Sequence, residues 1–261
     1  MVIHLVTYAH KEPFINTQKT LNATINSKTE YNVCKHRYSI NTLKNKSYYP
    51  IIKNIKKARD EVWDSNMQSQ RDEHWHSWKP YIVQEVYELM KPTDILYYVD
   101  SSRWVPSGFD AKIDKCIEWC NSNKKSIYGS VGLDYKNATI DYMGRTSQAE
   151  KISTLKNVIL DENKNNKMFL NQMHVLNAWF ILVKNNQTTN VIKDWCKAIS
   201  KPMNNIPAIL HSLTADQLIW SIVLSKYKST VFFDKNIKHI QNKNYNNIHH
   251  AKELNKNLIC M

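Results

Sequence analysis

An apolar segment in the middle of the chain, DILYYVDSSRW at residues 94–104, runs directly into an aspartate and two serines. A carboxylate beside hydroxyls suits Mg²⁺ or Mn²⁺, because these ions prefer oxygen ligands and usually take only one or two protein carboxylates beside the phosphates of a substrate. Asp100 and Ser101 would equally suit a turn that caps the end of a strand. This segment alone leaves both interpretations open.

A second candidate site residue is Lys79, which comes directly before Pro80. Proline is favoured in the first turn of a helix, and the N-terminus of a helix attracts anions. Lys79 is therefore a candidate contact for a phosphate group, and a solvated surface lysine is the alternative.

The elements around these residues alternate between strand and helix patterns. Strand patterns occur at 2–7, 31–40 and 94–99. Helical spacing begins at each of four residues that favour a helix start, Pro13, Pro50, Pro80 and Ser107. Such alternation predicts an α/β protein with a Rossmann-like, mostly parallel central sheet flanked by helices. Ligands of open sheets bind outside the carboxyl ends of the strands, which is where Asp100 would lie.

The second half of the chain is less regular. It offers strand patterns at 126–135, 138–143, 178–183 and 236–240, and helix patterns at 147–160, 188–199 and 213–227. No internal repeat or interdomain linker interrupts the 261 residues, so we expect a single domain, 1–261. The four glycines are scattered, which excludes a glycine-rich phosphate loop.

The chain is strongly basic, with 36 Lys and Arg against 23 Asp and Glu and a formal net charge of +13. Such a charge invites a nucleic-acid partner. However, the excess is nearly all lysine, and no zinc-finger or RNA-motif spacing is present, so we expect no nucleic-acid binding. A positive field also suits a phosphorylated ligand or peripheral contact with an anionic membrane.

The five cysteines are an odd, scattered set, which favours reduced thiols in a cytoplasmic compartment, either the host cytoplasm or a viral factory open to it. Cys116 and Cys120 would share one face of a helix with Ile113 and Ile117. A metal pair is conceivable there, but we expect these thiols to pack in the core. The N-terminus does not have the pattern of a secretory signal.

Four motifs occur in an order that resembles GT-A glycosyltransferases, which use nucleotide sugars. They are Asp100-Ser101-Ser102 after an apolar strand, LNAWFILVKN at 176–185, TADQLIWSIV at 214–223 and IHHAK at 248–252. The segment 78–100 also resembles polysaccharide glycosyltransferases of bacteria and large DNA viruses, and Asp216-Gln217 resembles the retaining, glycogenin-like enzymes. The resemblance covers roughly residues 1–255. It implies a nucleotide-binding half, 1–105, and an acceptor- and sugar-binding half, 106–261.

The resemblance implies a divalent cation, Mn²⁺ or Mg²⁺, held by Asp100 and by His249 or His250. Lys252, helped by Lys79, would neutralise the leaving diphosphate. Solvated loop histidines are the alternative for the late pair.

The remaining roles follow from the same resemblance. Asp216 and Gln217 would face the donor sugar. The alternative for Asp216 is that it only stabilises the first turn of a helix, where an acidic residue is favoured. Asn177 would contact sugar or acceptor. The other predicted nucleotide or sugar contacts are Thr7, Tyr8, Ser101 and Ser102. Two departures bear on this scheme: Ser102 replaces the usual second aspartate, which should weaken metal binding, and Trp179 replaces the usual glycine.

The sequence therefore predicts a metal-assisted, retaining glycosyltransferase of the hexosyltransferase type, in polysaccharide biosynthesis. It would move a sugar from a UDP- or GDP-linked donor to a glycan or lipid-linked acceptor. The alternatives are a catalytically degenerate nucleotide-sugar-binding protein, a Mg²⁺-dependent phosphohydrolase and a basic nucleic-acid-binding protein. Ser102 counts against the phosphohydrolase, because that class usually has a second aspartate two residues after the first.

Overall fold

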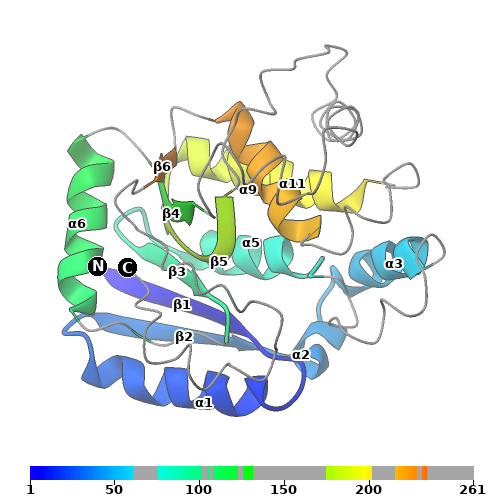
Figure 1. Cartoon of the computed structure of the whole chain (residues 1–261), viewed down its shortest axis with the longest axis horizontal. Helices are drawn as coiled ribbons and strands as arrows, with labels where there is room; N and C mark the ends of the chain where they lie inside the picture. The colour runs from blue at the N-terminus through cyan, green and yellow to red at the C-terminus, as the bar shows by residue number, and fades with distance from the viewer. Residues whose placement is uncertain are drawn as a thin grey trace, which may run out of the picture.

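A twisted β-sheet forms the centre of the computed structural model, which describes residues 1–60, 76–101, 105, 108–122, 126–131, 175–201, 215–227 and 231–233 (Figure 1). The described residues contribute six strands in the spatial order β2-β1-β3-β5-β4-β6. Their bounds are β1 Val2–Tyr8, β2 Asn32–Tyr38, β3 Ile95–Val99, β4 Ile127–Val131, β5 Val175–Val183 and β6 Val231–Phe233. Strands from both halves of the chain thus share one sheet.

One strand runs against the others. β1 is parallel to both β2 and β3, and β4 is parallel to β6, whereas β5 is antiparallel to both of its neighbours, β3 and β4. The predicted α/β class with a mostly parallel sheet is confirmed, with β5 as the reversed member. β3 lies inside the sheet, and all five of its residues are buried, as a strand covered on both faces requires.

Helices α1 (Phe14–Thr24) and α6 (Phe109–Ser122) cover one face of the sheet. Their apolar residues pack on alternate residues of the strands, in a cluster that includes Ile3, Leu5, Leu21, Ile25, Ile95, Tyr97, Val99, Phe109, Ile113 and Cys116. Cys116 and Cys120 are both buried, which confirms that these thiols belong to the core. Burial raises the pKa of the Cys120 thiol to about 11, so it is protonated at neutral pH.

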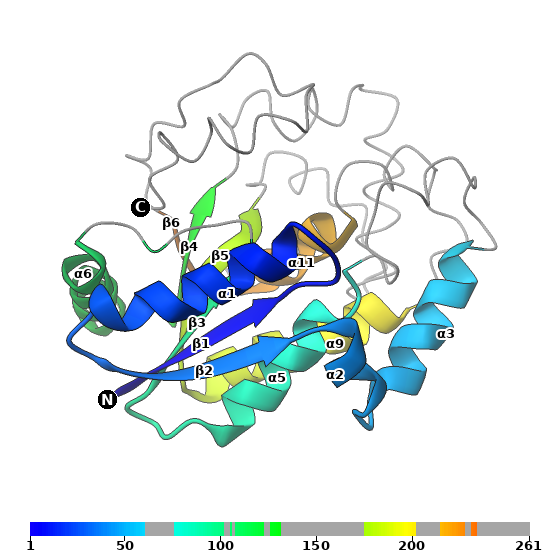
Figure 2. The ribbon, with the colours of Figure 1, turned by 90° about the horizontal axis from the view of Figure 1, so that it is seen from below.

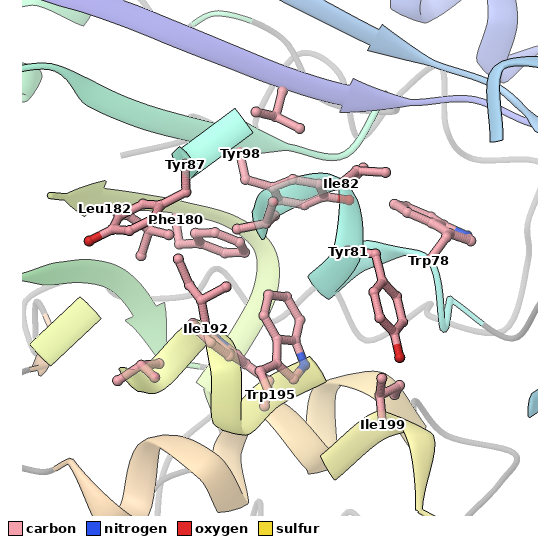
Figure 3. Close-up of a cluster of buried hydrophobic side chains, with 14 of the residues drawn as sticks. Trp78, Tyr81, Ile82, Tyr87, Tyr98, Phe180, Leu182, Ile192, Trp195 and Ile199 are labelled. Carbon is pink, nitrogen blue, oxygen red and sulfur yellow. The ribbon is translucent and has the colours of Figure 1, made fainter. Parts of the chain in front are cut away.

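Helices α5 (Lys79–Leu89), α9 (Asn186–Ser200) and α11 (Ala215–Lys226) cover the opposite face, with α3 (Tyr49–Asp60) and the short α2 (Ile40–Lys44) beside them (Figures 1 and 2). Large aromatic and branched side chains fill this layer. Figure 3 shows Tyr98 of β3 and Phe180 of β5 between the sheet and the helices, with ring centroids 4.9 Å apart. Trp195 of α9 and Trp220 of α11 pack against Phe180.

Local sequence signals set where these helices begin. Pro80 occupies the first turn of α5, as predicted. Asn185 caps α9, because its side-chain oxygen accepts a hydrogen bond of 2.9 Å from the backbone N–H of Thr188. Ser39 and Thr42 form a reciprocal capping box on α2.

Several predictions lie outside the described residues. They are the cap at Ser107 and the elements at 138–143, 147–160 and 236–240. Over the part of the chain that the structure describes, no helix is both long and apolar enough to cross a lipid bilayer.

Candidate functional site

Three charged residues from distant parts of the sequence meet where β3 ends. Lys79 is the first residue of α5, Asp100 directly follows β3, and Asp216 is the second residue of α11. α5 precedes β3 by a short turn and runs back along the sheet, so the N-terminus of this helix lies at the carboxyl end of the strand. The sequence predicted each residue separately as part of a site, and the structure brings them together.

The lysine ammonium lies between the two carboxylates. Lys79 Nζ is 3.1 Å from Asp216 Oδ2 and 3.5 Å from Asp100 Oδ1. The side chains of Lys79 and Asp216 are 2% and 4% exposed, whereas that of Asp100 is 34% exposed. Asp100 is therefore the most accessible of the three charged groups.

Aromatic side chains complete this group. The hydroxyl of Tyr98 donates a hydrogen bond of 2.6 Å to Asp100 Oδ1. Lys79 Nζ also lies 5.1 Å from the centroid of the Tyr98 ring and 5.8 Å from that of Trp78, within the range of a cation–π attraction. We call Lys79, Tyr98, Asp100 and Asp216 the Lys79 cluster. Tyr98 was not predicted as a site residue, although its place two residues before Asp100 puts both on one face of the strand.

The electrostatic balance of the Lys79 cluster favours the charged lysine. Burial by itself would lower the pKa of Lys79, but the negative charges of Asp100 and Asp216 and their hydrogen bonds outweigh it and raise the pKa above its usual value. Lys79 is therefore a cation at any physiological pH. Among these four residues, one ammonium and two carboxylates sum to a charge of −1.

The two residues predicted to lie near the nucleotide base differ in position. Tyr8, at the end of β1, stacks on Trp78 with ring centroids 3.8 Å apart, on the face of the sheet that carries Lys79. Thr7 is fully buried on the α1 face, where its hydroxyl accepts hydrogen bonds from Gln18 and Asn22 of α1. The position of the Thr7 side chain therefore gives no support to a ligand contact, whereas Tyr8 borders the Lys79 cluster through Trp78.

The backbone positions of three further predicted residues agree with a common site. Val99 of β3 pairs with Trp179 of β5 in antiparallel register, so Asn177 lies near the level at which β3 ends. Gln217 follows Asp216 in α11. Ser101 is buried beside Asp100.

Four of the predicted residues, Ser102, His249, His250 and Lys252, lie outside the described residues. The predicted approach of a late histidine to Asp100 therefore stays a prediction.

Comparison with known proteins finds little. No protein-family model and no curated protein match the chain. Among solved structures, the apo form of mouse xyloside xylosyltransferase 1 matches over 90% of this chain and 85% of its own, with a TM-score of 0.45 and 5% sequence identity. A likeness at this level carries no argument about activity, so the function has to be inferred from the residues of this chain.

The donor set of the Lys79 cluster fits a hard divalent cation. Asp100 offers carboxylate oxygen, the ligand that Mg²⁺ and Mn²⁺ prefer, and it is partly exposed. Because Asp216 is almost wholly buried beside Lys79, Asp100 is the described residue of this cluster best placed to hold such an ion.

Proposed function

We propose that this protein is a glycosyltransferase that moves a sugar from a UDP- or GDP-linked donor to a glycan or lipid-linked acceptor, with retention of configuration. The observation that carries the proposal is the convergence of Lys79, Asp100 and Asp216 at the carboxyl end of β3. Open α/β sheets bind their ligands at that edge. The order of sequence motifs described above supports the same reaction class.

Asp100 is proposed to hold Mn²⁺ or Mg²⁺, with His249 or His250 as the second protein ligand. When bound, the cation would supply positive charge to the departing diphosphate. Tyr98 fixes the orientation of the Asp100 carboxylate by donating a hydrogen bond to Oδ1, so the carboxylate is oriented before a ligand arrives.

Lys79 acts in this proposal as the positive charge that holds the two aspartates close together. The Lys79 ammonium is buried, so separating it from the two carboxylates would cost free energy, because an unpaired charge in the interior is strongly destabilising. Asp216, held by Lys79 at the start of α11, would accept hydrogen bonds from the donor sugar, with Gln217 beside it. Lys252 would meet the diphosphate from the C-terminal segment.

The first test is a thermal-shift screen of UDP, GDP, CDP and dTDP, each with and without Mn²⁺. A ligand at 100 times its dissociation constant stabilises the folded state by about 2.7 kcal/mol, which raises the melting temperature of a chain of this size by roughly 5–10 °C. We expect UDP or GDP to give such a shift and Mn²⁺ to increase it. No shift with any nucleotide would count decisively against the proposal.

Asp100→Asn tests the site directly. It should remove the Mn²⁺-dependent part of the shift, whereas the matched control Asp194→Asn should retain it, because Asp194 pairs with Lys226 and Tyr227, away from the Lys79 cluster. Release of free nucleotide from a panel of UDP- and GDP-sugars then separates an enzyme from a degenerate binding protein. The enzyme shows turnover that Asp216→Asn abolishes, and the binding protein shows the thermal shift without turnover.

A further inference from the structure

A second group of ligand-type side chains lies on the two neighbouring strands β1 and β2, beside Asp94, which precedes β3. His4 of β1 is paired in register with Cys34 of β2, and His36 follows two residues later on the same face. The ligand atoms of these three side chains all lie within 4.8 Å of one another. His4 Nδ1 and His36 Nε2 are 3.0 Å apart, with the two rings stacked.

We propose that His4, Cys34 and His36 bind a zinc ion. Imidazole and thiolate are the ligands that Zn²⁺ takes in proteins, at about 2.0–2.1 Å for nitrogen and 2.3 Å for sulfur, so tetrahedral ligands lie about 3.3–3.6 Å from each other. The present separations, 3.0 Å between the two ring nitrogens and at most 4.8 Å within the group, lie on either side of this spacing. The strand register already places the residues side by side.

Asp94 provides the outer support that such sites have. Its Oδ2 is 3.4 Å from His4 Nε2. Asp94 is itself held by the backbone N–H groups of Val2 and Lys91, both at 2.9 Å. A proton on His4 Nε2, donated to this carboxylate, leaves the lone pair of Nδ1 directed toward His36, and carboxylate–histidine pairs of this kind orient metal ligands.

Charge and access both agree with a zinc ion. Cys34 is exposed, His36 is half-buried and His4 is buried, so the group is open to solvent on the cysteine side, where water can supply a fourth ligand. Binding releases the Cys34 thiol proton to solvent, and the thiolate with the Asp94 carboxylate balances the two positive charges of the ion. The soft donor set also separates this site from the oxygen ligand Asp100, which suits Mn²⁺ or Mg²⁺.

The test uses the full-length, reduced protein after removal of metal by chelation, with Co²⁺ as a spectroscopic substitute for zinc. We expect Co²⁺ to produce a thiolate-to-cobalt charge-transfer band, and Zn²⁺ to abolish that band by displacement. Cys34→Ser should lose the band, whereas Cys196→Ser should retain it, because the Cys196 thiol of α9 donates to Gln84 of α5 and takes no part in the group. Absence of the band from the unmodified protein, or an equal band in Cys34→Ser, would overturn the proposal.

Three further measurements test whether the bound metal is held by these residues. Asp94→Asn should weaken zinc binding about 10- to 100-fold in a chelator competition. Asp100→Asn should leave the cobalt band unchanged, and loss of the band in that variant would overturn the assignment. Zinc should protect the Cys34 peptide from alkylation in the unmodified protein, a readout that needs no variant to fold; equal alkylation with and without zinc would also overturn it.

Discussion

Asp94 and Asp100 bracket the same strand, β3, and lie on the same face of the sheet, about 20 Å apart along the chain. Their surroundings differ completely. Asp100 is partly exposed and faces a buried lysine and a tyrosine hydroxyl, whereas Asp94 is buried and accepts from two backbone N–H groups and a histidine. The residue type and the strand are shared, so the role of each carboxylate is decided by the elements that pack around it.

The comparison also separates two kinds of chemistry. The carboxyl end of β3 carries permanent charges and oxygen donors, which suit a hard cation and phosphates. The strands β1 and β2 beside Asp94 carry two imidazoles and a thiol, which suit zinc. A single sheet can thus carry two sites of different ligand preference, and variants at each site should have separable effects.

The largest expected effect is that of Lys79→Met. Removing the ammonium takes a buried counter-charge away from the buried carboxylate of Asp216, so we expect the free energy of unfolding to fall by about 3–5 kcal/mol. Urea denaturation measures this loss. The double variant with Asp216→Asn should recover part of the stability, because the carboxylate that Lys79 pairs with is then gone. A loss below about 1 kcal/mol for Lys79→Met would contradict a buried ion pair at this end of β3.

Asp94→Asn should cost less, about 1–3 kcal/mol, because the amide keeps one acceptor oxygen for the two backbone donors. Burial would raise the pKa of Asp94, but the N–H groups of Lys91 and Val2, together with His4, outweigh it and lower the pKa. The contribution of the ionised carboxylate is therefore complete above about pH 4 and is lost as the pH falls through the lowered folded-state pKa. Urea unfolding should show a larger penalty at pH 7 than at pH 3, and an equal penalty at both would argue against this assignment.

Tyr98→Phe should have a smaller effect, about 1 kcal/mol, because Asp100 is exposed enough for water to replace the lost hydroxyl. The effect of Tyr98→Phe on ligand binding is more informative than its effect on stability. The variant should keep the Mn²⁺-dependent thermal shift that Asp100→Asn loses, since the proposed metal ligand is still present. Complete loss of that shift would mean that the hydroxyl itself contacts the ligand.

Asp194→Asn provides the baseline for both ends of β3. Its carboxylate pairs with the half-exposed Lys226 at 2.7 Å and accepts from the Tyr227 hydroxyl. Surface ion pairs contribute only about 0.2–1 kcal/mol, so we expect a loss in that range by urea denaturation. A loss as large as that of Lys79→Met would show that breaking an ion pair in this fold is costly whether the pair is buried or exposed.

Much of the local structure could be predicted from the sequence. The apolar run before Asp100 predicted a buried strand, and Pro80 predicted the start of α5, because burial and helix initiation leave patterns in neighbouring residues. The reversed direction of β5 was not predicted. Its run of apolar residues shows that it is buried, but the direction of a strand depends on how the chain outside it returns to the sheet.

The composition of the site was predicted better than its arrangement. Lys79, Asp100 and Asp216 were each selected, but nothing in their spacing along the chain shows that one ammonium lies between the two carboxylates. The group formed by His4, Cys34 and His36 was missed altogether. The alternation of Cys34 and His36 in a predicted strand was a usable signal, but it lacked the third ligand, which comes from β1.

The amino-acid sequence by itself determined most of the strands and helices in the described part of the chain, though not α2 or β6, together with the aspartate at the end of a buried strand and the basic net charge. These properties depend on residues close together in the chain, through hydrophobic periodicity, helix-start residues and composition. Only the tertiary structure decided that Lys79 joins Asp100 to Asp216, and that His4 lies beside Cys34. Such contacts arise from strand order and register, which follow from packing over the whole chain.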